Sequence, residues 1–303
     1  MNGTTPIKGP RFELARGDDG YPAQLDTIAN PPEKLFGVGS AGALVPGLAV
    51  VGARRATPYG IGCARRFARL ASEKGVTIIS GGALGCDSEA HKAALESSGR
   101  TVAVLGGGCD KPYPARHTQL FQKIVDNGGA IVSENTWDTE SMPYMFRERN
   151  RIIAGLSAAV LIVEAGLPSG TFSTADEALD AGRDVLVVPG CIVSAASHGS
   201  NRLLLQGATP IVDDDSFCDV LFSVFGALKR PDDGINPDQE DEHPIIEAIK
   251  AKPMKLDELY ILAERSFGAA DAQARLMEML VEAEAAHTIA RRNDGTWGPA
   301  VPW

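Results

Sequence analysis

Short apolar runs alternate with helix-length amphipathic segments between Leu48 and Val212, and this alternation constrains the fold more than any other feature. The runs are nearly continuous rather than alternating with polar residues, which is typical of strands that are covered on both faces. They are Leu48–Val51, Val76–Ile79, Thr101–Leu105, Ala130–Val132, Ala159–Val163, Val185–Val188 and Pro210–Val212. The pattern predicts an α/β fold with a doubly wound parallel sheet and right-handed crossovers.

The composition changes after residue 226, which predicts more than one domain. Residues 227–242 are rich in Asp, Pro, Gly and Glu, and are predicted to form an acidic linker. Residues 243–303 are predicted to form helices at Ile245–Lys250, Lys255–Glu264 and Asp271–Ala285, followed by strands His287–Arg291 and Thr296–Ala300 around an Asn-Asp-Gly turn. Helices followed by such a hairpin indicate a winged-helix-like domain. Residues 46–226 are then the sheet domain, and residues 1–45 an N-terminal helical or extension segment.

Glycine-containing loops follow five of the predicted strands. In a parallel sheet, ligands bind beyond the carboxyl ends of the strands, and glycine lets backbone N–H groups and helix N-termini approach a phosphate. Hydroxyl groups lie in the same loops, together with Arg54 and Arg55, whose guanidinium groups can pair with phosphate oxygens. The predicted phosphate contacts of these loops are Gly52, Arg54, Thr57, Ser80, Gly81, Gly106, Gly107, Ser169, Gly170 and Thr171. Taken singly, each loop also fits an ordinary tight turn; five loops at one edge favour phosphate binding.

A second basic cluster runs from Arg147 to Arg151 and contains the candidate DNA contacts Arg149, Asn150 and Arg151. Its arginines either form a solvated helix face that pairs with acids, or bind phosphate. Phe146 and Tyr144 lie beside it and either pack in the core or stack on bases, as in proteins that bind single strands.

The net charge of −10 argues at first against nucleic acid, but its distribution matters more. Residues 50–151 hold 14 Lys and Arg against 10 Asp and Glu, so the basic charge is concentrated there. The five dispersed cysteines indicate reduced thiols, and neither a metal nor a cofactor is expected. Without a long apolar run or a signal-like first segment, no membrane association is expected, and the predicted location is the cytoplasm.

The familiar nucleotide-binding motifs are missing or poorly placed. The phosphate-binding pattern GxxxxGK followed by Ser or Thr does not occur. One GxGxxG pattern spans Gly37–Gly42, but the residues before it do not suggest a strand and no clear helix opens after it. We therefore do not expect a dinucleotide site there.

A series of ordered motifs resembles the bacterial DNA-processing protein A (DprA/Smf) family. The segments that carry the resemblance are Tyr21–Gly39, with its paired prolines, Leu48–Gly60, which contains Gly-Ala-Arg-Arg-Ala-Thr-Pro-Tyr-Gly, Ser80–Leu95, Thr101–Pro114, Phe146–Ser157, which contains Arg-Asn-Arg, and Glu164–Gly190. The similarity runs from about Tyr21 to Asp213.

The resemblance implies an extended Rossmann-like domain that is not an enzyme. It also implies a homodimer, a basic pocket for single-stranded DNA, the loading of RecA recombinase onto DNA during natural transformation or DNA processing, and in many members a C-terminal winged helix. By position, the pocket arginine of the family matches Arg54, and its Arg-Asn-Arg element matches Arg149 and Arg151.

The alternative is a nucleotide-processing hydrolase similar to the phosphoribohydrolases nicknamed lonely guy. Their PGGxGTxxE motif is comparable with the stretch from Pro168 to Asp176. Phe172 stands at a glycine position of that motif, where its ring is expected to obstruct the nucleotide turn. Measurable base release from nucleoside monophosphates would favour this alternative.

Overall fold

A computed structural model describes residues 6–167, 169–226, 243–251, 254–268, 271–286, 288–292 and 295–299. The chain divides into two compact units, residues 1–228 and 229–303. The predicted linker, residues 227–242, lies outside the described residues.

The described part of the first unit is built on a nine-stranded sheet with the order β1-β2-β6-β5-β4-β3-β7-β8-β9. The strands are β1 (Arg11–Ala15), β2 (Lys34–Gly39), β3 (Gly47–Val51), β4 (Ile78–Ser80), β5 (Thr101–Val104), β6 (Ala130–Ser133), β7 (Ser157–Ile162), β8 (Asp184–Val187) and β9 (Thr209–Pro210). The seven strands from β3 to β9 pair in parallel, which confirms the predicted doubly wound α/β sheet.

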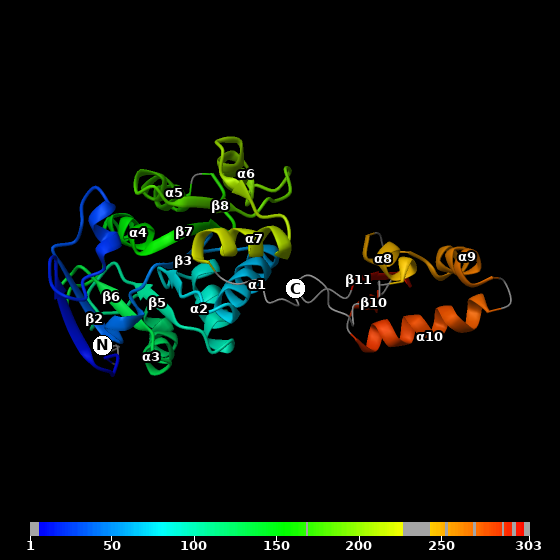
Figure 1. The fold of residues 1–303 in the computed structure, drawn as a ribbon, viewed down its shortest axis with the longest axis horizontal. Helices are drawn as coiled ribbons and strands as arrows, with labels where there is room; N and C mark the ends of the chain where they lie inside the picture. Colours follow the sequence, from blue (N-terminus) through cyan, green and yellow to red (C-terminus); the bar gives the residue numbers. More distant parts are fainter. Residues whose placement is uncertain are drawn as a thin grey trace. The chain divides into compact units, whose positions relative to one another are not determined.

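Helices cover both faces of this sheet (Figure 1). They are α1 (Pro58–Glu73), α2 (Cys86–Glu96), α3 (Thr118–Asp126), α4 (Met145–Leu156), α5 (Thr171–Asp180), α6 (His198–Leu205) and α7 (Asp214–Phe225). Successive residues of a strand point to opposite faces, so Ala49 and Val51 of β3 pack with α4 and α5, whereas Leu48 and Val50 pack with α1, α2 and α7. This arrangement explains why the apolar runs are continuous.

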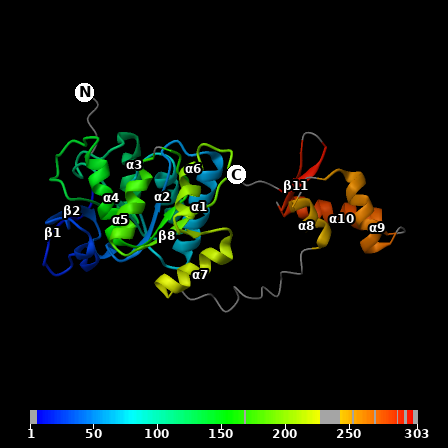
Figure 2. The same cartoon turned by 90° about the horizontal axis from the view of Figure 1, so that it is seen from above.

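Two strands at one end of the sheet were not predicted (Figure 2). β2 pairs antiparallel with both β1 and β6. The expectation that no strand precedes the GxGxxG pattern was wrong, because Lys34–Gly39 is β2. Only a short 3-10 helix, Ala41–Ala43, follows it, so a strand–turn–α-helix unit for a dinucleotide is not formed there. The N-terminal segment therefore extends the sheet.

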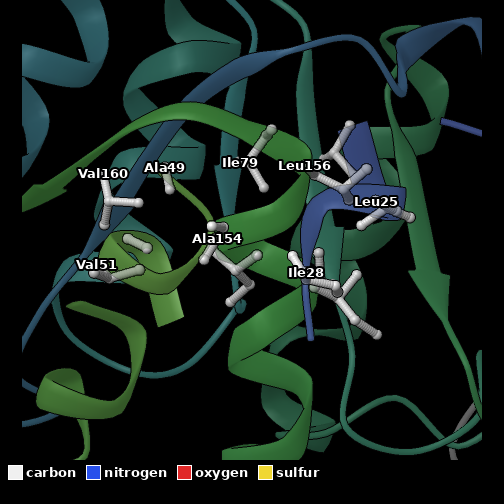
Figure 3. Close-up of a cluster of buried hydrophobic side chains, with 14 of the residues drawn as sticks. Leu25, Ile28, Ala49, Val51, Ile79, Ala154, Leu156 and Val160 are labelled. Atoms are coloured by element: carbon white, nitrogen blue, oxygen red, sulfur yellow. The ribbon is translucent and has the colours of Figure 1, made fainter. Parts of the chain in front are cut away.

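The N-terminal segment also contributes to the core. Leu25 and Ile28, in and after the 3-10 helix Ala23–Thr27, pack against Ala154 and Leu156 of α4 (Figure 3). A Cβ at Gly155 would lie within 3 Å of both Leu25 and Ile28, so a glycine is needed at this contact. The contact anchors the carboxyl end of α4, whose middle carries the Arg-Asn-Arg element.

The second unit contains α8 (Pro244–Ala251), α9 (Leu256–Phe267), α10 (Ala272–Ala285), β10 (Ile289–Arg291) and β11 (Trp297–Pro299). β10 and β11 pair antiparallel, and Met254 forms a bridge with Trp297. Ile249, Leu259 and Leu276 are among the residues of its core. The element order agrees with the predicted helices and hairpin, and the winged-helix identity stays a prediction; His287, the Asn293-Asp294 part of the turn and Ala300 lie outside the described residues.

Among the described residues, no helix combines the length and the apolar character needed to cross a bilayer.

Candidate nucleic-acid interface

A cavity of about 470 Å³ opens beyond the carboxyl ends of β3 and β7. These strands are neighbours, and the chain winds in opposite directions on either side of them, which is where parallel sheets place their ligands. The loop after β3 forms one wall with Gly52, Arg54 and Arg55, and a second wall is formed by Gly166, Ser169, Gly170 and Thr171. The first turns of α4 supply the remaining wall.

Arg149 projects from α4 beneath this cavity and is only 5% exposed. Its Nη1 donates to the carbonyl oxygens of Gly81, at 2.8 Å, and Val104, while its Nε has no partner among the described residues. Burial lowers the pKa of Arg149 to about 10, because a buried guanidinium loses its hydration, and nearby Asp87 opposes this change. The guanidinium nevertheless stays charged at neutral pH.

Asp87 also lines the cavity, and its Oδ2 accepts hydrogen bonds from the backbone N–H groups of Gly81 at 3.1 Å and Ala83 at 3.4 Å. Burial raises the pKa of this carboxyl group above its ordinary value, whereas Arg149 lowers it. No carboxylate of the described residues lies within 4.0 Å of the Arg149 guanidinium, so Arg149 is left with unused capacity for an anion.

Three further arginines face the cavity from exposed positions: Arg54, Arg55 and Arg147. None of them forms an ion pair with a described residue, whereas Arg65, Arg66 and Arg151 are all paired with carboxylates. The guanidinium of Arg54 lies 5.2 Å from the centre of the Phe146 ring. Unpaired positive charge is therefore gathered on the rim and floor of this cavity, where it raises the local concentration of anions.

Neutral donors complete the wall opposite Arg54. Ser169 Oγ accepts from the backbone N–H of Thr171 at 3.1 Å, at the beginning of α5. Asn150 Nδ2 donates to Ser173 Oγ at 2.8 Å and so ties α4 to α5. A Cβ at Gly170 would meet nothing within 4 Å, so this backbone is open to a ligand.

The structure brings the predicted residues Gly52, Arg54, Arg149, Asn150, Ser169, Gly170 and Thr171 to one cavity. Arg151 does not line it, contrary to expectation. Its guanidinium forms a two-point ion pair with Glu134, at 2.8 and 2.6 Å, and its Nε donates to the carbonyl of Asn30. Glu134 raises the pKa of Arg151 through these hydrogen bonds. The structure thus gives Arg151 the alternative role of pairing with an acid.

Five other predicted contacts do not line this cavity, and each packs against or hydrogen-bonds to another part of the chain. Thr57 caps α1, and Ser80 is fully buried with its Oγ donating to the carbonyl of Val50. Gly106 and Gly107 are buried beneath the segment before α4, where a Cβ would lie within 3 Å of Phe146 and Ser141. Gly81 packs against the guanidinium of Arg149. These residues belong to the loops near the strand ends but not to the lining of the cavity.

Sequence reasoning missed the contributions of Asp87 and Ser173 to the cavity. It had named Arg55 beside Arg54 as a phosphate partner and Arg147 as part of the second basic cluster, and the structure places both at the cavity. Asp87 gave no such signal, because α2, which holds it, and α4, which holds Arg149, cover opposite faces of the sheet. The described residues contain no group of three or more His, Cys, Asp or Glu side chains placed to hold a metal ion.

Comparison with known proteins identifies the family. The sequence profile of the family described as DNA recombination-mediator protein A matches residues 13–222. The chain is 38% identical to Protein Smf of Escherichia coli, over 94% of this chain and 76% of that protein.

Two solved structures agree with this match. The DNA processing protein A of Streptococcus pneumoniae superposes with a TM-score of 0.64 and 34% identity, covering 70% of this chain and 74% of that one. The Helicobacter pylori protein, whose structure concerns a single-stranded DNA binding mode, gives 0.65 and 32%, covering 72% and 99%.

These findings do not support the hydrolase alternative, because the matching family is one of recombination mediators rather than enzymes. Residues 13–222 include the whole cavity, and the ordered motifs of the sequence lie within them. The chain therefore belongs to the DNA processing protein A (DprA/Smf) family.

Proposed function

We propose that the cavity binds the backbone of single-stranded DNA. The observation that carries the proposal is Arg149: a buried guanidinium without a carboxylate within ion-pair distance among the described residues, on the floor of a cavity that Arg54 also faces. A buried charge is costly unless it is paired, and a phosphate entering the cavity supplies the missing anion. Arg55 and Arg147 add positive charge at the rim.

Aromatic rings beside the cavity favour a single strand over an isolated phosphate or a duplex. Phe146 lines the cavity, and Tyr113, which is 54% exposed, lies 5.3 Å from it between ring centres in a tilted arrangement. Unstacked bases bind to such exposed rings, whereas the bases of a duplex are already stacked on one another. The published single-stranded DNA binding mode of the Helicobacter pylori relative supports the same assignment.

The test is fluorescence anisotropy with a labelled oligothymidylate at two salt concentrations. Arg54→Ala is expected to weaken binding about 10-fold and to reduce the slope of log K against log salt by about 0.7, because one phosphate contact is lost. Arg69→Ala is the matched control, since Arg69 is exposed on α1 and lies 3.8 Å from Glu73. Equal binding by wild type and Arg54→Ala would place the DNA elsewhere.

The family description as a recombination mediator extends the proposal to the fate of the DNA. The chain, as a cytoplasmic homodimer, hands the bound strand to RecA recombinase. A mixture of the chain, RecA and labelled single-stranded DNA is expected to form RecA filaments faster than RecA alone. An Arg54→Ala variant that accelerates filament formation as well as wild type would separate RecA loading from this cavity.

A further inference from the structure

Glu164 lies at the end of β7, is 2% exposed and does not line the cavity, yet it touches the loop that carries Arg54 at both of its ends. Its backbone oxygen accepts from the N–H of Ala53 at 2.8 Å. Its carboxylate accepts from Thr57 twice, from the backbone N–H at 2.8 Å and from Oγ1 at 2.6 Å. One residue therefore holds both ends of residues 53–57.

The carboxylate of Glu164 also takes the place of an external anion at the beginning of α1. Thr57 Oγ1, which donates to Glu164, accepts in turn from the backbone N–H of Gly60 at 3.2 Å. A Cβ at Gly60 would lie 2.7 Å from Glu164 Oε2, so the glycine makes room for the carboxylate. The first turn of α1, which in many nucleotide-binding sheets receives a phosphate, is already occupied from within the chain.

The two loops that Glu164 joins are opposite walls of the cavity. Residues 53–57 hold Arg54 and Arg55, and both side chains are exposed. The segment that follows Glu164 holds Gly166, Ser169 and Gly170 of the facing wall. The position of Arg54 relative to the beginning of α5 consequently depends in part on the hydrogen bonds of Glu164, whose backbone oxygen holds one end of the loop and whose carboxylate holds the other.

We infer that Glu164 is a positioning residue, which fixes Arg54 across the cavity from the beginning of α5 without touching the DNA itself. The inference rests on the proposed binding of single-stranded DNA in this cavity. The Thr57–Glu164 contact then fixes the position of Arg54 in the site, in addition to stabilising the fold.

Glu164→Gln is the variant that tests this role, because an amide keeps the shape of the carboxylate but loses one of its two acceptors. The amide NH2 group then faces either the backbone N–H of Thr57, which cannot accept, or the Thr57 hydroxyl, which has to turn its own hydrogen elsewhere. In both cases a hydrogen bond to a charged acceptor is lost, and one end of the Arg54 loop is held less tightly. We expect Glu164→Gln to weaken binding of the labelled oligothymidylate about 5- to 10-fold and to lower the salt slope by about 0.7, as the loss of one arginine contact does.

A double-mutant cycle separates positioning from general destabilisation. In an Arg54→Ala background, Glu164→Gln is expected to change the dissociation constant less than about 2-fold, because the residue it positions is already gone. Glu134→Gln is the matched control: it changes a half-buried carboxylate that holds Arg151, outside the cavity, and is expected to leave binding unchanged. Additive effects of Glu164→Gln and Arg54→Ala would overturn the inference.

Limited trypsin digestion gives a second readout that does not depend on DNA. Trypsin cuts after Arg54 and Arg55 only when their loop can leave its fixed conformation. We expect Glu164→Gln to speed cleavage at these two bonds about 10-fold relative to wild type, with Glu134→Gln unchanged there. Thr57→Val, which removes the hydroxyl that donates to Glu164 and caps α1, is expected to act in the same direction. Thr57→Ser, which keeps the hydroxyl and the backbone N–H, is expected to keep wild-type protection.

The two readouts distinguish the two proposals. Wild-type protein that binds no oligothymidylate would overturn the proposed function, and the digestion would still decide whether Glu164 fixes the loop. Wild-type protection of the Arg54 and Arg55 bonds in both Glu164→Gln and Thr57→Val would overturn the positioning role, even if the cavity binds DNA.

Discussion

Helices α1 and α5 both begin at the carboxyl edge of the sheet, but their first turns meet different partners. α1 begins at a buried carboxylate, because Glu164 accepts two hydrogen bonds from its N-cap residue Thr57. α5 begins at Thr171 after the N-cap Gly170, which has no side chain, and among the described residues it is the neutral Ser169 Oγ that accepts from the N–H of Thr171. Both N-termini carry partial positive charge, and only that of α5 is offered to the cavity.

The comparison shows how a nucleotide-binding type of sheet can be adapted to a polynucleotide. Filling the first βα turn with an internal anion removes the usual phosphate position there. The same anion fixes Arg54, which then faces the beginning of α5 with Arg149 beneath. What remains is an open cavity with cations on several sides, which suits a passing chain of phosphates rather than one terminal phosphate group.

The largest loss of affinity for single-stranded DNA is expected from removing the positive charge of Arg149 on the floor of the cavity. Arg149→Met keeps an unbranched side chain but leaves no buried cation for a phosphate, and we expect single-stranded DNA binding to weaken about 100-fold. Arg149→Lys keeps a positive charge but loses the planar guanidinium group, and its affinity is expected to lie between those of wild type and Arg149→Met. Anisotropy titration measures both, with circular dichroism as the check on folding. Wild-type affinity of Arg149→Met would contradict the role of α4 in the site.

A carboxylate introduced at the beginning of α5 is expected to occupy the N-terminus of that helix, as Glu164 occupies the N-terminus of α1. In Ser169→Asp, the new side chain can accept from Thr171 as Ser169 Oγ does, and negative charge near a helix N-terminus is expected to raise the free energy of unfolding by about 0.5 kcal/mol. Binding of the labelled strand is expected to weaken about 10- to 30-fold, because the carboxylate repels phosphate.

Ser169→Asn is the control for that variant, since it has the same shape without the charge. It should bind within about 3-fold of wild type, a difference of under 1 kcal/mol. If Ser169→Asp and Ser169→Asn lose the same affinity in this titration, the size of the side chain and not its charge causes the loss. A carboxylate at the beginning of α5 would then not act as Glu164 does at the beginning of α1.

The predicted parallel sheet was confirmed because its strands are continuous apolar runs, a local signal. β2 gave no such signal: it contains two glycines, and Gly37 is needed because a Cβ there would lie 2.1 Å from the ring of Phe12 on β1. That requirement comes from a neighbouring strand, so residues 34–39 alone do not reveal it. Glu164 was similarly hidden, because its partner Thr57 is 107 residues away in the sequence.

The Arg-Asn-Arg element shows a limit of arguments from helix spacing. Residues two apart on a helix point about 200° away from each other, yet Arg147 and Arg149 of α4 both line the cavity and Arg151 does not. Spacing alone therefore does not decide which arginines face the cavity. The sequence could not show which of them would be bound by a carboxylate, because Glu134 approaches from the segment after β6.

The smallest effect on binding is therefore expected from Arg151, although it lies only two residues from Arg149. Arg151→Met breaks the pair with Glu134, whose side chains are 14% and 23% exposed, and is expected to lower the free energy of unfolding by about 1–2 kcal/mol. Affinity for the labelled strand should stay within about 2-fold of wild type, because the lost charge was already balanced. Chemical denaturation and anisotropy measure the two quantities separately. A loss of affinity as large as that of Arg149→Met would mean that DNA draws Arg151 away from Glu134. The contrast between Arg151, which is paired with a carboxylate, and Arg149, which is not, would then fail.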